Sequence, residues 1–448
     1  MDMNYLPNTK EDRQKMLEAI GVSSVEDLFA DLPQDVRLGR PLDLPAGLSE
    51  LELGRLMREL SEKNGDLNHY TSFLGAGVYD RFTPSVVEHV LSRAEFYTAY
   101  TPYQPEISQG VLQSIYEYQS MICELTGMDV SNASMYDGAS ALAEAGLMCA
   151  TSTGRRKLVV SRLVHPEYRK VLATYARGVD LEIVEVSFQE GRTDLEDLKG
   201  KVDDQTAGVL IQNPNFLGNL EEVQVIEAAA HGKGSLLVVA VDPISLGLLA
   251  PPGAYGADIV VGDGQSLGNP ISFGGPHLGF LAVRERLVRR MPGRIVGATL
   301  DNRGQRGFVL TLTAREQHIR RERATSNICS NQALNALAVT VYLSLLGKGG
   351  LKEVANQSLQ KAHYAHQALS RLERFQPAFS APFFQEFAVR TTLEPDEVNR
   401  ELLKHRIIGG YDLGRDYPEL KNHLLLAFTE KRSKEEIDYF VARLEGLL

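Results

Sequence analysis

The sequence feature that most limits the fold is an alternation of apolar and amphipathic segments between residues 155 and 263. The apolar segments, such as 157–161, 235–242 and 257–262, are short, continuous and rich in branched aliphatic side chains. Such runs are typical of strands that are buried on both faces. Between them lie segments with helical spacing of apolar residues, such as 222–231. This alternation predicts an α/β domain whose mostly parallel sheet is covered by helices on both sides.

The segments on either side of this core have other patterns and set the predicted domain limits. Residues 1–62 hold helix starts at Thr9 and Ser49 around a Pro-rich linker, which predicts a helical arm. The large α/β domain is predicted over 63–335. Residues 336–448 begin with a long apolar segment ending near Gly347, continue with two short apolar runs and close with an amphipathic segment. They predict a smaller α+β domain.

Bulk properties exclude several classes of protein. The net charge of −11 argues against nonspecific binding of nucleic acid. The first residues lack a basic region followed by an apolar one, and no run of 18 apolar residues occurs, so neither a signal peptide nor a membrane span is expected. Three cysteines lie far apart in the sequence, which favours reduced thiols in a cytoplasmic protein.

Residues 260–280, VVGDGQSLGNPISFGGPHLGF, have the outline of a pyridoxal phosphate loop, with a buried strand, a polar turn and a Gly-Gly-Pro bend. Asp242 ends an earlier strand, where an acid can keep the cofactor's pyridine nitrogen protonated, although an acid that caps the next turn would look the same. Such enzymes place a Schiff-base lysine about 20 to 30 residues later. The turn at Gln265 and Ser266 has that spacing, yet no lysine occurs between Lys233 and Lys348. This stretch therefore cannot form the Schiff base.

Two further features could serve a cofactor site. The helix start at 137–140, Asp-Gly-Ala-Ser, offers backbone N–H groups and a hydroxyl to a phosphate, but an aspartate that only caps the helix is an equal alternative. His165 follows another strand, where an imidazole could stack on a flat ring or simply be a satisfied cleft histidine.

Two more features suggest contacts with a ligand or a partner. Tyr97, Tyr100 and Tyr103 lie at a spacing of three in a segment that prolines keep from being a regular helix, so they are expected to line a site unless they pack in the core. Residues 284–323 contain 11 arginines, no lysine and 4 acids. An anionic ligand or an acidic partner would explain this balance, and so would salt bridges between subunits.

Long motifs resemble one family along essentially the whole chain. They are SFLGAGVYDRFTPSVVEHVLSRAEFYTAYTPYQPEISQG, PISFGGPHLGF, MPGRIVG and REQHIRRERATSNICSNQAL. The chain is similar to the glycine cleavage system P-protein, a pyridoxal-phosphate-dependent glycine dehydrogenase (decarboxylating). It looks like subunit 1, the alpha form found where the enzyme is split into two homologous chains. The resemblance implies the fold-type-I, aspartate aminotransferase-like architecture.

The same resemblance accounts for the absent lysine. The homologous second subunit, beta, carries it in a His-Lys turn and binds pyridoxal phosphate covalently, whereas this chain does not. The family implies an α2β2 assembly in which glycine loses CO2 and its aminomethyl group passes to the lipoyl arm of the H-protein. The T- and L-proteins are further functional partners. A scaffold subunit that only stabilises its catalytic partner remains an alternative, as does a self-sufficient enzyme that uses some other lysine.

The resemblance also suggests site residues. Thr325, with Ser326 and Asn327, corresponds to residues of fold-type-I enzymes that reach the cofactor phosphate of a neighbouring subunit. The tyrosine segment is expected to line the shared glycine site. His165 and Asp242 are interpreted as relics of a lost site in this chain.

Overall fold

The computed structural model describes residues 7–324 and 326–447. The chain forms two compact units, Met1–Gly65 and Asp66–Leu448. The first unit contains α1 (Lys10–Ile20), α2 (Glu50–Ser61) and two single 3₁₀ turns. Thr9 and Ser49 each begin a helix with a capping box. The cap hydroxyl accepts from the backbone N–H of the acid three residues later, and that acid's carboxylate accepts from the backbone N–H of the cap residue. The two helix starts predicted from the sequence are therefore confirmed.

The first unit has almost no core of its own. Among residues 7–65, Leu17 is the one side chain classed as buried. Apolar side chains along α2, including Leu51, Leu56 and Met57, are exposed. A helix without burial of its apolar stripe gains little stability in isolation. We therefore expect this unit to depend on contacts outside itself.

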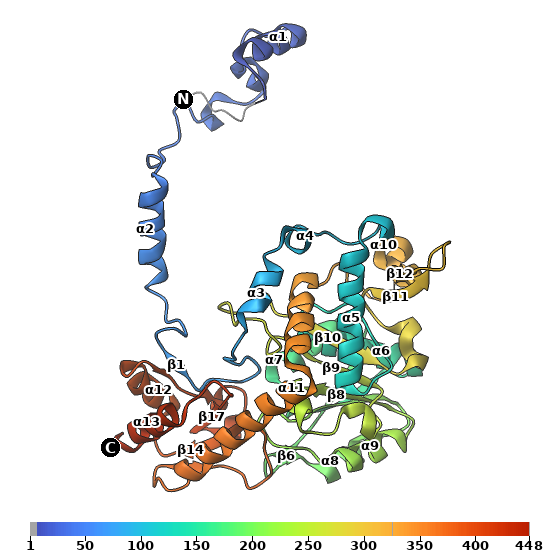
Figure 1. Ribbon diagram of the computed structural model, residues 1–448, viewed down its shortest axis with the longest axis vertical. Helices are drawn as coiled ribbons and strands as arrows, with labels where there is room; N and C mark the ends of the chain where they lie inside the picture. The colour runs from blue at the N-terminus through green and yellow to red at the C-terminus, as the bar shows by residue number, and fades with distance from the viewer. Residues whose placement is uncertain (1–6, 325, 448) are drawn as a thin grey trace. The chain divides into compact units, whose positions relative to one another are not determined.

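The second unit is built on a seven-stranded sheet in the order β2-β10-β9-β8-β7-β3-β4 (Figure 1). Strands β9, β8, β7, β3 and β4 are mutually parallel, while β10 runs antiparallel to both β9 and β2. The predicted mostly parallel sheet is therefore confirmed. The strands are β2 (Val130–Ser131), β3 (Lys157–Ser161), β4 (Glu182–Val186), β7 (Thr206–Gln212), β8 (Leu236–Val241), β9 (Ile259–Asp263) and β10 (Gly279–Val283).

Helices cover both faces of this sheet because its strands are apolar on both faces. Alternate strand residues such as Val159 and Val209 pack with α5 (Gln109–Thr126) and α9 (Val223–His231). Their neighbours Leu158 and Leu210 pack on the other face, with α6 (Gly138–Thr153) and α7 (Pro166–Gly178). Because successive side chains of a strand point to opposite faces of the sheet, each strand contributes to two separate cores.

A long helix, α11 (Ala333–Leu369), connects the sheet to the C-terminal part; Figure 1 shows it passing from beside α5 to beside β14. Gly347 has non-helical dihedral angles, φ 58° and ψ −174°, and breaks the helix there. The predicted helix end at Gly347 is therefore confirmed, and a second helical segment follows in which Leu351, Ala355 and Ala362 are buried. Its length and apolar composition would suit a membrane span, but its buried side chains belong to the core clusters.

The C-terminal part holds a four-stranded antiparallel sheet in the order β13-β14-β17-β16, packed against α11, α12 and α13. A separate small domain from residue 336 stays a prediction. These elements are β13 (Phe375–Pro377), β14 (Glu386–Thr391), β16 (Tyr411–Asp412), β17 (His423–Ala427), α12 (Pro395–Lys404) and α13 (Lys434–Glu445). The remaining elements are β1 (Thr71–Ser72), β5 (Phe188–Gln189), β6 (Arg192–Thr193), β11 (Ile295–Leu300), β12 (Arg306–Thr311), β15 (Ile407–Ile408), α3 (Ser85–Leu91), α4 (Ala94–Tyr97), α8 (Leu195–Lys201) and α10 (Gln317–Arg320).

Candidate functional site

A small cleft lies at the carboxyl ends of β3, β7, β8 and β9, where ligands bind in open α/β sheets. Asp242 and His165, two residues singled out from the sequence, both line it, and so does Ser266 of the loop. Its volume is about 40 Å³. That is far below the roughly 300 Å³ or more of a typical small-molecule pocket. The described residues that line it include no lysine.

Asp242 is fully engaged by protein groups. Its Oδ1 accepts from the backbone N–H of Ile244 at 3.0 Å, and its Oδ2 accepts from Nε2 of Gln385 at 2.6 Å. Burial raises the pKa of this carboxyl, against the opposing effect of Arg81. The carboxylate therefore caps the turn after β8 and anchors Gln385 of the C-terminal part.

His165 is likewise held by its neighbours. Its Nε2 bonds the carbonyl oxygen of Ala76 at 2.9 Å, and its Nδ1 accepts from the N–H of Glu167 at 3.1 Å. Since Nδ1 accepts, the proton lies on Nε2, and burial lowers the pKa of the ring. The imidazole stacks on Tyr168 with ring centroids 4.9 Å apart and an interplanar angle of 24°. The flat ring that it faces is thus a side chain of this protein.

The two residues at the lysine-like turn have different environments. Gln265 is buried, and its Oε1 accepts from the backbone N–H of Tyr79 at 3.0 Å. Its Nε2 donates to the carbonyls of Tyr79 at 3.2 Å and Asn269 at 2.9 Å. Ser266, by contrast, lines the cleft. The Gln265 amide therefore uses both its donor and its acceptor to hold the segment around Tyr79 in place.

A buried network that sequence reasoning missed continues from this segment. Tyr79 donates its hydroxyl to Glu386 at 2.9 Å, and Glu386 also accepts from the N–H of Ala76 at 2.6 Å. Burial raises the pKa of Glu386 to about 7. Arg81 bonds Gln385, Ser358 at 3.2 Å and Glu430. These partners lie hundreds of residues apart, so no local sequence pattern marks them.

The start of α6, a second phosphate candidate, is also closed. Asp137 accepts from the N–H of Ser140 at 2.7 Å, and Asp263 accepts from the N–H of Gly138 at 3.1 Å. A β-carbon at Gly138 would lie 2.0 Å from the hydroxyl oxygen of Tyr168, so that side chain covers the first turn. Carboxylates use the donors and an aromatic ring fills the space. The residues of this cleft therefore do not fit pyridoxal phosphate.

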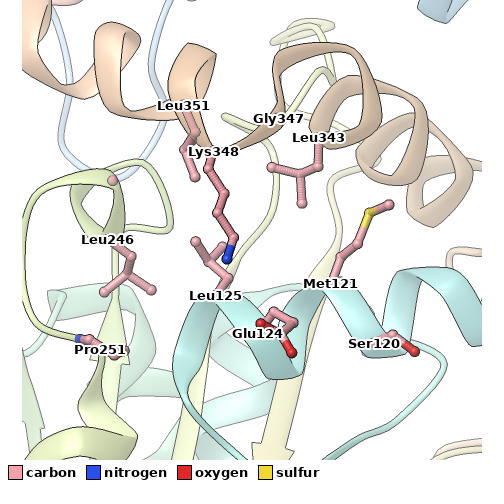
Figure 2. Close-up of a pocket in the computed structure, with 11 residues that line it drawn as sticks. Ser120, Met121, Glu124, Leu125, Leu246, Pro251, Leu343, Gly347, Lys348 and Leu351 are labelled. Atoms are coloured by element: carbon pink, nitrogen blue, oxygen red, sulfur yellow. The ribbon is translucent and has the colours of Figure 1, made fainter.

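Lys348, the next lysine after Lys233, lies elsewhere. It lines a separate cavity of about 510 Å³ with Leu125, Leu246 and Leu343, between α5, α11 and the turn after β8. Figure 2 shows its side chain extending from α11 across this cavity toward α5. None of the residues around the small cleft lines this cavity. Lys348 is thus no substitute for a Schiff-base lysine in the cleft.

The tyrosine segment is set apart from the cleft. Tyr97 ends α4, and Tyr97, Tyr100 and Tyr103 are 69%, 86% and 53% exposed, so core packing does not explain them. Tyr97 and Tyr100 line a cavity of about 170 Å³ together with Asn331. Arg294 donates to the Tyr103 hydroxyl at 3.1 Å and lies over its ring.

The other predicted phosphate contacts lie near a buried acid. Thr325 lies outside the described residues. Ser326 donates to Glu144 of α6 at 2.8 Å and accepts from the N–H of Ile328 at 3.1 Å, and Asn327 follows it in the same loop. Burial raises the pKa of Glu144 to about 7. The structure thus ties this loop to α6, and neither Ser326, Asn327 nor Glu144 lines the small cleft.

Comparison with known proteins assigns the chain to a family. The family model for the glycine cleavage system P-protein matches residues 3–444. The chain belongs to the P-protein family. A probable glycine dehydrogenase (decarboxylating) subunit 1 of Carboxydothermus hydrogenoformans is 60% identical over 444 residues, covering 99% of this chain and all of that protein. The corresponding protein of Moorella thermoacetica is 57% identical over 446 residues and is covered completely.

Solved structures agree with this assignment. The crystal structure of a glycine decarboxylase (P-protein) of the glycine cleavage system, in inhibitor-bound form, has a TM-score of 0.91 at 47% identity, with complete coverage of both chains. A sphingosine-1-phosphate lyase of Burkholderia pseudomallei has a TM-score of 0.67 at 15% identity, covering 92% of this chain and 94% of its own, which shows the fold alone. The predicted P-protein subunit 1 family and the fold-type-I architecture are confirmed.

Proposed function

We propose that this chain is the subunit of a cytoplasmic, aminomethyl-transferring glycine dehydrogenase (decarboxylating) that does not hold the cofactor. It completes the active site of a homologous, lysine-bearing partner in an α2β2 assembly. Pyridoxal phosphate on that partner supplies the electron sink for loss of CO2 from glycine. The aminomethyl group then passes to the lipoylated H-protein, and the T- and L-proteins carry out the later steps of glycine cleavage.

The filled cleft carries this proposal. A cofactor enzyme of this fold needs an amine for the Schiff base and space for a ring and a phosphate. This cleft holds about 40 Å³ and has Gln265 and Ser266 at the turn. Asp242 and His165 lie at the sheet edge where cofactors bind in this fold, and each side chain makes two hydrogen bonds to protein groups. These contacts support a relic role for both residues.

Two exposed features of this chain are proposed to serve the partner's site. Tyr97, Tyr100 and Tyr103 present rings and hydroxyls on an irregular segment, as expected of residues that line a shared glycine site. The loop with Thr325, Ser326 and Asn327 is proposed to donate to the partner's cofactor phosphate. Hydroxyl and backbone donors on a loop suit a dianion.

The direct test is to express the chain with and without its lysine-bearing partner. Alone, the purified chain should show no visible Schiff-base absorbance and no decarboxylation of glycine. The assembled complex should decarboxylate glycine, and the partner alone should do so weakly or not at all. Schiff-base absorbance in the isolated chain would contradict the proposal.

A scaffold role is the alternative outcome of the same experiment. A scaffold stabilises the partner without contributing side chains to the chemistry. Under that hypothesis, substitutions at Tyr100 or Thr325 change assembly but leave turnover of the assembled complex unaltered. Size-exclusion chromatography separates assembly from turnover, so the two hypotheses predict different results.

A further inference from the structure

A polar cavity lies at the edge of the sheet opposite the small cleft. Its volume is about 390 Å³, and it lies next to the amino ends of β3, β7 and β8. The end of α6 contributes Ser152, Arg155 precedes β3, and the turn after β10 contributes Arg286 and Arg290. Three guanidinium groups, one from the segment before β3 and two from the turn after β10, therefore share one cavity.

Each guanidinium has donors to spare. Arg155 uses Nη1 for the carbonyls of Thr206 and Lys233, both at 2.8 Å, while Arg290 uses Nη1 for the carbonyl of Thr151. Arg286 uses Nη2 for Asp258. The other side-chain nitrogens of these arginines have no acceptor among the residues that the structure describes. An arginine presents five N–H donors, so most of them remain for a ligand.

The nearby acid does not neutralise this charge. Asp258 is buried, and its second oxygen accepts from His231 and from the N–H of Leu237, each at 2.9 Å. It therefore balances only Arg286 and the histidine. Arg155 and Arg290 have no carboxylate partner in the described part of the chain. The cavity thus carries a net positive charge.

A hydroxyl next to the cavity also lacks a partner in the described part of the chain. The Oγ of Ser152 is buried and has no hydrogen-bond partner among residues 7–324 and 326–447. Its neighbour Thr153, by contrast, donates to the carbonyl of Cys149 at 2.8 Å. A buried hydroxyl without a partner is disfavoured by desolvation. The Oγ has almost no surface open to a water-sized sphere, so a ligand acceptor in the cavity would satisfy it after a change of the Ser152 rotamer.

We propose that this cavity binds a compact phosphorylated small molecule. A tetrahedral phosphate accepts hydrogen bonds in several directions, which matches donors that converge from three segments, and arginines bind it strongly. The lining contains no aromatic side chain, so nothing there favours a nucleobase. This site also gives a role to part of the arginine-rich segment 284–323, because Arg286 and Arg290 belong to it. It is independent of the function proposed above.

Titration calorimetry of the assembled complex with inorganic pyrophosphate, at constant ionic strength and without glycine, tests the proposal. We expect saturable binding that Arg290→Gln weakens about tenfold, since a charge-assisted hydrogen bond is lost. Arg289→Gln is the matched control, because Arg289 is exposed like Arg290 but does not line the cavity. Ser152→Ala removes only the unpartnered hydroxyl and should also weaken binding.

Three results would overturn the proposal. They are absence of saturable binding to the wild-type complex, equal losses from Arg289→Gln and Arg290→Gln, and tighter binding of citrate than of pyrophosphate. The second would mean general attraction of anions to a basic surface. The third would mean a preference for planar carboxylates. If Arg290→Gln fails to fold, Ser152→Ala alone must weaken binding for the proposal to stand.

Discussion

Gln265 pairs with both backbone groups of Tyr79, a residue 186 positions earlier in the chain. The side-chain amide accepts from the Tyr79 N–H and donates to the Tyr79 carbonyl. It thus pairs with Tyr79 as the backbone of a neighbouring strand would. A lysine has donors but no acceptor and could not make this pair. Gln265, at the cofactor-like turn, is therefore suited to hold the segment around Tyr79, which closes the cleft.

Replacing Gln265 by lysine should destabilise the chain without creating a cofactor site. The change removes three hydrogen bonds and buries a charge, so we expect a loss of about 2–4 kcal/mol in the free energy of unfolding. Urea denaturation measures this loss, and absorbance in the presence of pyridoxal phosphate measures binding. Ser266→Ala is the control. Stoichiometric Schiff-base absorbance in Gln265→Lys would show that the cleft opens more readily than its contacts imply.

Glu386 should make stability depend on pH. Its folded pKa is raised from 4.5 to about 7, so folding favours the protonated form. Its contribution to stability is complete below pH 4.5 and falls as the pH rises to about 7. The total is about 3 kcal/mol, from 1.36 kcal/mol per pKa unit. Glu386→Gln should flatten this part of the stability–pH curve in denaturant titrations. Glu435→Gln, at an exposed position on α13, should leave the curve unchanged, and equal effects of the two changes would refute the assignment.

Tyr100 is the most exposed residue of the tyrosine segment and gives the clearest test of the shared site. Tyr100→Ala should lower kcat/KM for glycine decarboxylation by about tenfold or more in the assembled complex, because a ring and a hydroxyl leave the site. Tyr439→Ala, on α13, serves as a control at an exposed tyrosine. An intact α2β2 complex with unchanged kinetics would favour the scaffold role instead.

Thr325→Ala should weaken retention of pyridoxal phosphate by the complex, by about tenfold if one phosphate hydrogen bond is lost. Ser326→Ala should weaken cofactor retention less than Thr325→Ala, because it removes only the hydrogen bond that holds the loop to Glu144. Dialysis of the loaded complex, followed by assay of the remaining cofactor, measures both. Thr313→Ala, in a neighbouring turn, provides the comparison. Unaltered cofactor affinity in Thr325→Ala would rule out the phosphate contact.

The local sequence pattern predicted the secondary structure well where the spacing of buried residues matches the period of a helix or a strand. The strands at 157–161 and 236–241 and the capped helices after Thr9 and Ser49 are found as expected. Gly347 breaks the helix as predicted, and a second helical segment follows because apolar residues beyond the break are buried in a core. The candidate residues Asp242 and His165 do meet at one sheet edge, because parallel strands bring their carboxyl ends together.

The sequence by itself determined the parallel sheet, the family and the lack of any lysine between Lys233 and Lys348. These follow from local periodicity, from long motifs and from residue type. Only the tertiary structure decided that the cleft is filled. Tyr168 covers the start of α6, and Gln265 and Glu386 fix the segment around Tyr79. These contacts join residues far apart in sequence, and their strength comes from burial, which no local pattern specifies.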